Sequence, residues 1–343
     1  AQRADRLAVV RSYAPHDISD HAQAIKHVLT GGNALGFESG LGAFHARLHG
    51  RSYDSTGCPI FTRLIEDELE DEYRQDRERM FSGNQAGKWG SAYEPFDPLN
   101  GSGLDADLNL NLPLSRLEDR RGLRGELDKL KRLADSSPAL SASDQHRQQA
   151  VDVLLGGVAR KALDLSTEDS KIVNRYSTEH LKTGWLSKRP STLGHRMLMA
   201  RRLVEAGVGV VAVRFAPDGR GDYEKTMIGW DDHAVHGNIF EIMRNRGPQF
   251  DQAVSALIED LEERGMHDDV LVVVVGEFGR TPRVHVHKGC PGREHWGPAG
   301  CALVYGGGLT MGHVVGSTND KGEHPQERPV TYQDLLATIY HHL

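Results

Sequence analysis

Ionisable side chains gather directly after an apolar run in the last third of the chain. Residues 271–275 (LVVVV) are mostly β-branched and show no polar alternation, which is typical of a central strand covered on both faces. Glu277 follows between two glycines, so its carboxylate is expected at the carboxyl end of this strand, where open α/β sheets place their ligand sites. His285, His287 and His295 lie in the Gly- and Pro-rich loop beyond it. This stretch is the first candidate site.

A second concentration of possible metal ligands lies in the segment WDDHAVH. It contains Asp231, Asp232, His233 and His236. Mixed carboxylate and imidazole ligands suit Zn²⁺, Mn²⁺ or iron better than Ca²⁺ or Mg²⁺, which favour oxygen. Surface clusters of Asp and His are also common without a metal. The position of the segment favours a metal site, because the segment follows one predicted strand and Glu277 follows the next.

The loop SYAPHDISDH presents a third group of polar side chains. A strand is predicted before it, over residues 6–11, and a helix after it, over residues 21–29 and ending at glycines. His21 therefore stands at the start of a helix, where side chains and backbone amides can meet an anion. The alternative is that Asp20 merely caps the helix and His21 lies on its surface.

The histidine-rich loop also permits a structural zinc site. His285 and His287 alternate on one face of a short predicted strand, and Cys290 and His295 follow them. These four residues are of the types that structural zinc prefers. The alternative is a solvated loop.

Helices and strands alternate in the second half of the chain. A helix over residues 195–207 leads into a buried strand over 208–215, and an amphipathic helix over 250–261 leads into the strand over 271–275. This order is what a parallel sheet with right-handed crossovers requires. We therefore predict an α/β fold with a doubly wound, mostly parallel sheet and helices on both faces.

The C-terminal part adds two further strands, over residues 298–308 and 313–315. A helix over residues 331–342 closes the chain, with Thr331 as its N-cap and Asp334 as the acid of a capping box.

The middle of the chain is predicted to be largely helical. Residues 61–79 are charge-dense and are predicted to form an exposed helix. Helices are also predicted over residues 114–133, 144–163 and 167–181, and they suggest a helical insertion over 114–181 within a single domain spanning 1–343.

Composition excludes several classes of protein. The net charge of -7 and the lack of a basic stripe argue against nucleic acid as a partner. No apolar run reaches the length of a membrane span. Three cysteines are too few for a disulfide scaffold.

Several motifs taken together carry a resemblance. They are GEFGRTPRV, GREHWGPAG, WDDH, LTGG and the C-terminal stretch GSTNDKGEHPQERPVTYQDLLATIYHHL. The chain resembles domain of unknown function family 1501, sulfatase-like bacterial proteins of the alkaline phosphatase superfamily, over nearly its whole length. The resemblance implies export to the periplasm or cell surface, and a first strand upstream of Ala1.

The resemblance also implies a divalent metal. Proteins of this superfamily hold one or two metals by Asp and His at the carboxyl ends of strands, where the metals polarise a phosphate or sulfate ester. Sulfatases often hold calcium, so Zn, Mn and Ca all remain open. Asp231 and His233 match the Asp-x-His ligand pair, with His236 as a substitute for His233. Glu277 stands where the superfamily has an Asp, and His295 matches the last His ligand.

Two positions depart from the superfamily pattern. Phe278 replaces a His ligand, and because a phenyl ring cannot ligate, a single-metal or altered site is expected. His21 falls where sulfatases have a Cys or Ser nucleophile. A histidine there can act as a ligand or as a nucleophile toward phosphorus, but it cannot become formylglycine.

The resulting hypothesis is a metal-dependent hydrolase of phosphate or sulfate esters, acting on a small-molecule or glycan anion. The expected metal ligands are Asp231, His233, Glu277 and His295. His21 would face the substrate, and Arg280 or Arg293 would pair with its anionic oxygens, because a guanidinium binds such oxygens bidentately. Surface ion pairs are the alternative for both arginines. The rival hypothesis is a non-catalytic metal- or anion-binding surface protein that retains the fold.

Overall fold

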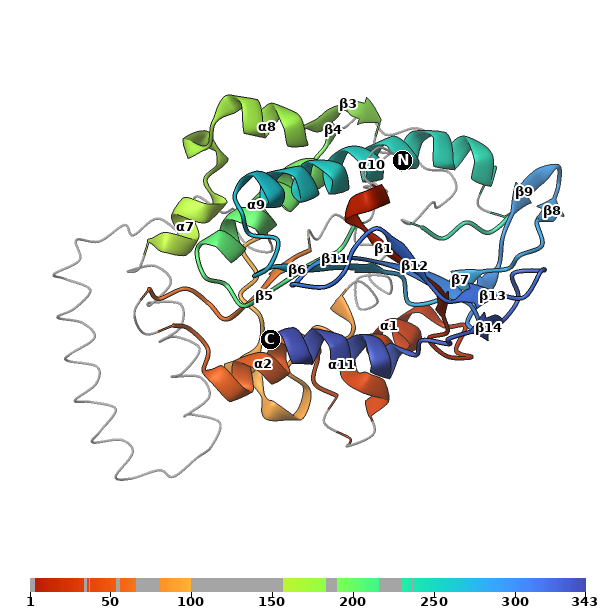
Figure 1. The fold of residues 1–343 in the computed structure, drawn as a ribbon, viewed down its shortest axis with the longest axis horizontal. Coiled ribbons are helices and arrows are strands. Elements are labelled where there is room, and N and C mark those ends of the chain that lie inside the picture. The colour runs from red at the N-terminus through yellow and green to blue at the C-terminus, as the bar shows by residue number, and fades with distance from the viewer. Residues whose placement is uncertain are drawn as a thin grey trace, which may run out of the picture.

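The computed structural model describes most of the chain outside its middle third. The described residues are 4–33, 36, 38–53, 56–65, 81–99, 157–182, 190–215, 230–235 and 237–343. They form three layers, with strands in the middle and helices above and below them (Figure 1). The prediction of an α/β fold with helices on both faces is confirmed.

Seven α-helices lie within these residues: α1 (His21–Thr30), α2 (Leu41–His49), α7 (Val158–Leu163), α8 (Ser170–Tyr176), α9 (Leu193–Glu205), α10 (Ile239–Glu263) and α11 (Tyr332–His342). Helices α8, α9 and α10 cover one face of the strands, and α1, α2 and α11 cover the other (Figure 1). Short 3-10 helices are Ala4–Arg6, Gly31–Asn33, Gly87–Trp89, Ser91–Tyr93 and Leu165–Thr167. Across the described part of the chain, no helix combines the length and apolar character needed to cross a membrane.

The main sheet has four strands in the order β12 (His313–Val315), β1 (Ala8–Tyr13), β11 (Gly300–Gly306) and β6 (Leu271–Val275). Strand β1 pairs parallel to β12, whereas β11 is antiparallel to both of its neighbours. The sheet is therefore mixed rather than mostly parallel. The reason is that the chain returns from β6 to β11 through short hairpin-like strands, and an antiparallel neighbour needs no helical crossover.

Strand β6 lies at one end of this four-stranded order, and its side chains are half-buried rather than fully covered. The prediction of a central strand buried on both faces was wrong in this respect. The strand nevertheless delivers Glu277 to its carboxyl end, as the apolar run predicted.

The other described strands form two-stranded pairs: β2 (Phe61–Leu64) with β5 (Val210–Val213), β3 (Thr178–Lys182) with β4 (Pro190–Ser191), β7 (Gly279–Arg280) with β10 (His295–Trp296), β8 (His285–His287) with β9 (Cys290–Gly292), and β13 (Ser317–Thr318) with β14 (Pro325–Glu327). Of these pairs, β2 and β5 are parallel.

The predicted helix over residues 61–79 was wrong at its start. Phe61 and Leu64 are buried in strand β2, and Thr62 between them is buried as well. The periodicity of a short apolar run does not distinguish a helix from a doubly buried strand. Here the parallel pairing with β5 shows that the segment is a strand. Residues 66–80 lie outside the described part.

The predicted helical insertion is described only from residue 157 onward. Helix α7 lies at the end of the segment predicted over residues 144–163, and α8 lies within the segment predicted over 167–181. Residues 178–181 belong to strand β3 and not to a helix. The predicted helix over residues 114–133 lies outside the described residues.

Two apolar clusters join the helices to the sheet. Leu198 of α9 and Leu257 and Ile258 of α10 lie in the cluster above the strands. Val304 of β11 and Leu335 of α11 lie in the cluster below them. Together these clusters hold the carboxyl ends of β1 and β6 in a fixed relation, which the candidate site requires.

A buried charge network adds a third connection, between α8, α9 and α10. The side chain of Arg201 is 1% exposed, and its nitrogens lie 2.8 Å from Asp260 Oδ2 and 2.5 Å from Glu168 Oε2. Asp260 also accepts a hydrogen bond from the hydroxyl of Tyr176 on α8 at 3.1 Å. Each charge in this network is compensated by an opposite charge, as burial demands.

The capping box predicted for the last helix is confirmed. The backbone N–H of Asp334 donates to the Thr331 hydroxyl at 3.2 Å, and the backbone N–H of Thr331 donates to the Asp334 carboxylate at 2.8 Å.

Removing the Thr331 hydroxyl should lower stability. We expect Thr331→Ala to reduce the free energy of unfolding by about 0.5–2 kcal/mol, the usual cost of losing an N-cap. Thr338→Ala on the same helix is the matched control, because its exposed hydroxyl only bonds back to the Asp334 carbonyl. Urea unfolding measures both, and equal losses in the two variants would contradict the capping role.

Candidate metal centre

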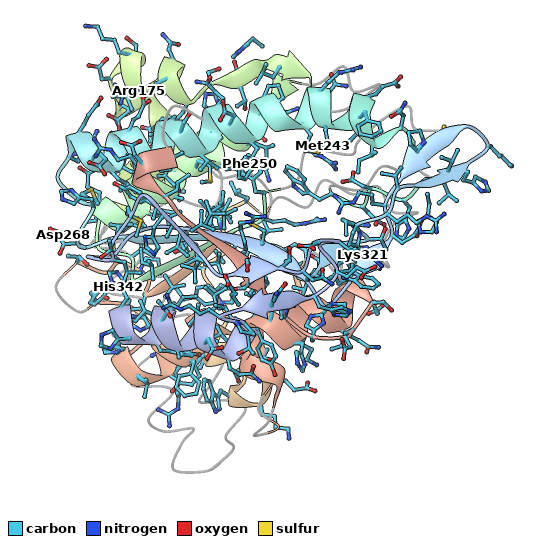
Figure 2. The ribbon with its side chains drawn as sticks, turned by 45° about the vertical axis from the view of Figure 1, so that its right-hand side comes forward. Arg175, Met243, Phe250, Asp268, Lys321 and His342 are labelled. Atoms are coloured by element: carbon cyan, nitrogen blue, oxygen red, sulfur yellow. The ribbon has the colours of Figure 1, made fainter. Side chains whose placement is uncertain are left out.

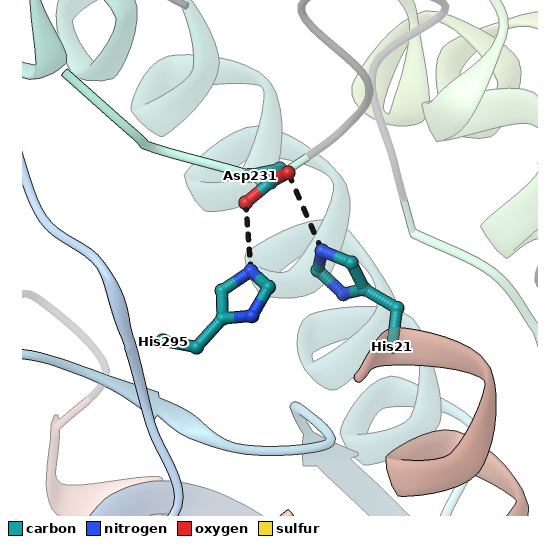
Figure 3. A group of neighbouring side chains, drawn as sticks. All are labelled: His21, Asp231 and His295. Atoms are coloured by element: carbon teal, nitrogen blue, oxygen red, sulfur yellow. Dashed lines mark hydrogen bonds and ion pairs between the residues drawn. The ribbon is translucent and has the colours of Figure 1, made fainter. Parts of the chain in front are cut away.

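Four separate segments of the chain meet at the carboxyl ends of β1 and β6. His21 comes from the start of α1, Asp231 and His233 from the segment before α10, Glu277 from the turn after β6, and His295 from β10. Figure 3 shows Asp231 between the rings of His21 and His295. All five of these side chains lie in one cluster. Successive predicted strands indicated this for the Asp231 segment and Glu277, and the family resemblance indicated it for His21 and His295.

The cluster lies toward one end of the molecule. Met243, which contacts Arg246 beside the Asp231 segment, and Lys321 lie toward that end in Figure 2, and Asp268 lies at the opposite end. Asp268 precedes β6, so the cluster lies at the far end of that strand.

At the start of α1 the predicted Asp20 cap is formed, but His21 does not lie on the helix surface. Asp20 caps the helix by accepting the backbone N–H of Gln23 at 2.9 Å, and Gly31 ends it in the left-handed region with φ 74°. His21 is the first helical residue, and its side chain turns into the cluster instead of toward solvent. The cap therefore orients the residue that reaches the site.

Asp231 is the common partner of the three histidines. Its Oδ2 lies 3.3 Å from Nε2 of His21, and its Oδ1 lies 3.1 Å from Nε2 of His233 and 3.1 Å from Nε2 of His295. Ligand atoms of His21, Asp231 and His295 all lie within 4.8 Å of one another. Every ring thus presents the same nitrogen, Nε2, to one carboxylate.

The opposite nitrogen of each ring, Nδ1, contacts an outer acceptor. The pairs are His21 with Glu277 Oε1 at 2.6 Å, His233 with Glu294 Oε2, and His295 with the carbonyl oxygen of Ser19 at 2.5 Å. Outer partners of this kind fix the tautomer and the orientation of metal-binding histidines. Glu277 therefore lies behind His21 rather than among the three Nε2 atoms.

The tautomers follow from these partners. Nδ1 of His295 faces a carbonyl oxygen and Nδ1 of His233 faces a carboxylate, so both nitrogens must donate and carry the proton. In a neutral ring Nε2 then carries a lone pair. The two Nε2 atoms lie 2.8 Å apart, beside an oxygen of Asp231. Arg280 already donates to this oxygen, but the two imidazole lone pairs facing each other repel unless an added proton or a metal cation lies between them.

The charges of the cluster shift its pKa values. Burial raises the pKa of Asp231, but its contacts with His21 and His295 and the charge of Arg280 outweigh burial and hold that pKa well below its usual range. Burial likewise lowers the pKa of His233, and the carboxylates of Asp231 and Glu294 do not fully offset this, so an added proton on His233 is disfavoured.

For His21, the neighbouring carboxylates outweigh the effect of burial on the pKa. Burial lowers its pKa, but the carboxylates of Asp231 and Glu277 on its two ring nitrogens raise it to about 9. The ring is therefore held by two negative charges.

The two arginines have different surroundings. Arg280 donates from Nη1 to Asp231 Oδ1 at 2.8 Å and from Nη2 to the Trp230 carbonyl at 2.9 Å, so it orients the central carboxylate. Arg293 donates to the carbonyl oxygens of Thr281 and Arg280, at 2.5 and 3.0 Å. The role of either arginine in binding a substrate anion stays a prediction.

Phe278 packs against the imidazoles. Its ring is buried, and its centroid lies 4.3 Å from that of His295 and 5.2 Å from that of His21. Phe278 therefore forms an apolar wall of the cluster.

The WDDH segment divides its side chains between two tasks. Asp232 is buried and forms an ion pair with Arg246 of α10, whose guanidinium also lies 4.4 Å from the ring centroid of Trp230. Asp232 therefore anchors the segment while its neighbour Asp231 faces the histidines. His236, the predicted substitute for His233, lies outside the described residues.

The structural zinc site is not formed. His285 and His287 are exposed on the hairpin of β8 and β9, with His287 opposite Cys290, but His295 turns away from them toward Asp231. Among the described residues, the ligand atoms of His21, Asp231 and His295 lie close enough together to hold a metal, and Nε2 of His233 lies beside them, 2.8 Å from that of His295. The hypothesis failed because the hairpin ends at Gly292, and His295 begins β10, which pairs with β7 instead.

Sequence reasoning missed Glu294 and Arg246. Glu294 directly precedes an expected ligand in GREHW, and that adjacency was a usable signal. Arg246 carried no local signal, because its partner is 14 residues away and the contact depends on how α10 packs.

The fold and the site define a mixed α/β protein with a histidine and carboxylate cluster at the carboxyl ends of its strands. A sequence model described as "protein of unknown function (DUF1501)" matches residues 1–343, and the chain belongs to that family. None of the curated proteins and none of the solved structures matches the chain.

Proposed function

We propose that the protein is a metal-dependent hydrolase of phosphate or sulfate esters. Its metal would be held by Asp231 together with Nε2 of His21, His233 and His295. The observation that carries this proposal is the convergence of lone pairs from His233, His295 and Asp231, each ring already giving its proton to an outer acceptor.

The chemistry of the donor set fits a divalent transition metal. Three imidazole nitrogens and one carboxylate suit Zn²⁺, Mn²⁺ or iron, whereas Ca²⁺ takes six to eight oxygens. Glu277 supplies its oxygen to His21 at 2.6 Å, so we propose it as an outer partner and not as a ligand. Zn²⁺ and Mn²⁺ are the metals to test first.

The surrounding residues would support hydrolysis. When bound, such a metal polarises an ester oxygen and lowers the pKa of a bound water. Arg280 would keep Asp231 in place, and its charge would favour an anionic substrate nearby. Phe278 would exclude water from one side of the cluster. Resemblance to the sulfatase-like superfamily supports an ester substrate, a core of the alkaline phosphatase type and export from the cytoplasm.

One observation favours the rival function, a metal-binding protein without turnover. His21 stands where sulfatases have their nucleophile, yet Glu277 and Asp231 engage both of its ring nitrogens. Hydrolysis would then depend on attack by water.

Turnover of aryl esters separates the two functions. We expect protein loaded with Zn²⁺ or Mn²⁺ to hydrolyse p-nitrophenyl phosphate or sulfate, and we expect chelation or Asp231→Asn to abolish this activity. Stoichiometric metal without turnover of either ester would contradict the hydrolase and favour the metal-binding protein.

A further inference from the structure

We infer that Glu294 is a positioning residue that holds His233 in the tautomer and orientation of a metal ligand. This inference rests on the proposed metal site and adds a residue to it. Glu294 contacts no ligand atom of the cluster centre. Its carboxylate meets Nδ1 of His233, on the side of the ring away from Asp231.

The backbone of Glu294 is fixed where it can do this. Its N–H donates to the Thr281 hydroxyl at 3.1 Å, and its carbonyl accepts the N–H of Thr281 at 2.9 Å. The next residue, His295, begins β10 and contributes its own ring to the cluster. Residues 294 and 295 therefore supply both the ring of His295 and the carboxylate that contacts the ring of His233.

His233 depends on Glu294 as the other two rings depend on their own outer partners. His21 has Glu277 and His295 has the Ser19 carbonyl. Without an acceptor at Nδ1, His233 could place its proton on Nε2 and lose the lone pair that faces Asp231. Loss of such an outer partner typically costs about 10- to 100-fold in metal affinity.

The partial exposure of Glu294 allows its role to be tested without a large change in packing. Its side chain is 40% exposed, so substitution removes little buried packing. The Zn²⁺ dissociation constant is measured by chelator competition on the full chain for wild type, Glu294→Gln and Glu294→Ala. Glu263→Gln is the matched control, because Glu263 is 56% exposed and forms its ion pair with Arg175.

We expect Glu294→Ala to weaken Zn²⁺ binding by about 10- to 100-fold. Glu294→Gln should weaken it less, because an amide oxygen still accepts from Nδ1, and Glu263→Gln should leave it unchanged. The melting temperature of the metal-free protein should stay the same in all three variants, which separates positioning from general stability.

A double-mutant cycle tests the path through His233. If Glu294 acts only by holding that ring, Glu294→Ala should have no further effect on the Zn²⁺ dissociation constant in a His233→Ala background. Zn²⁺ binding by wild type with an unchanged dissociation constant in Glu294→Ala would overturn this inference and leave the proposed metal site intact. Failure of wild type to bind Zn²⁺ would overturn both.

Discussion

Asp231→Asn is expected to weaken metal binding by more than about 100-fold, which exceeds the loss typical of an outer partner. Asp231 contacts the Nε2 atoms of all three histidines, and the substitution removes the negative charge that draws a cation among them. An amide nitrogen would also present protons toward the site. The measurement is the Zn²⁺ dissociation constant by chelator competition, with metal content after dialysis as a second readout.

The control for Asp231 is the same substitution on an exposed carboxylate. Asp251 lies on the exposed side of α10, and Asp251→Asn should leave the dissociation constant within about twofold of wild type. Retention of wild-type affinity in Asp231→Asn would show that Zn²⁺ binding does not depend on this carboxylate, and it would contradict the place of Asp231 in the proposed site.

The second large effect concerns stability away from the site. We expect Arg201→Ala to lower the free energy of unfolding by at most about 3–5 kcal/mol, the usual cost of removing one partner from a buried ion pair. The loss stays within this limit because Asp260 keeps Arg264 as a partner at 2.8 Å and Glu168 keeps Arg202 at 2.7 Å. Arg201 is 1% exposed and compensates Asp260, also 1% exposed, and Glu168, which is 10% exposed. Without the guanidinium, these carboxylates would lose their central partner inside the packing of α8, α9 and α10.

Arg175→Ala is the matched control for Arg201. Arg175 lies on α8 near the edge of the molecule in Figure 2, and it pairs with the 56% exposed Glu263 at 2.7 Å. A surface pair of this kind contributes at most about 1 kcal/mol. Both variants are measured by urea unfolding. Similar losses of unfolding free energy in the two variants would mean that burial does not make the Arg201 network more stabilising than a surface ion pair.

Local signals predicted individual elements well. The apolar runs gave β1, β6 and β11, and the caps at Asp20 and Thr331 marked the starts of α1 and α11. These features depend on a few neighbouring residues, so the sequence alone can predict them. The direction of β11 could not be predicted from local signals, because the pairing of distant strands depends on the chain path between them. Here that path contains no helix.

The sequence predicted which of these residues meet but not the contacts of each side chain, and their roles as ligands or catalytic groups stay predictions. Asp231 and His233 were expected in the site because their segment follows a predicted strand, and His295 because of the family resemblance. The three do meet. His21 was expected to face them as a catalytic residue, but its Nε2 joins the same carboxylate. Glu277 was expected as a ligand, but its oxygen lies on the far side of His21. Such roles follow from side-chain geometry, which spacing alone does not determine.

The central claim is that this cluster binds a metal, and elemental analysis of the purified protein tests it most directly. The samples are wild type and Asp231→Ala/His295→Ala, each dialysed against metal-free buffer. We predict near-stoichiometric zinc or manganese in wild type and its loss from the double variant. Wild type without metal, or equal metal in both proteins, would contradict the proposed site.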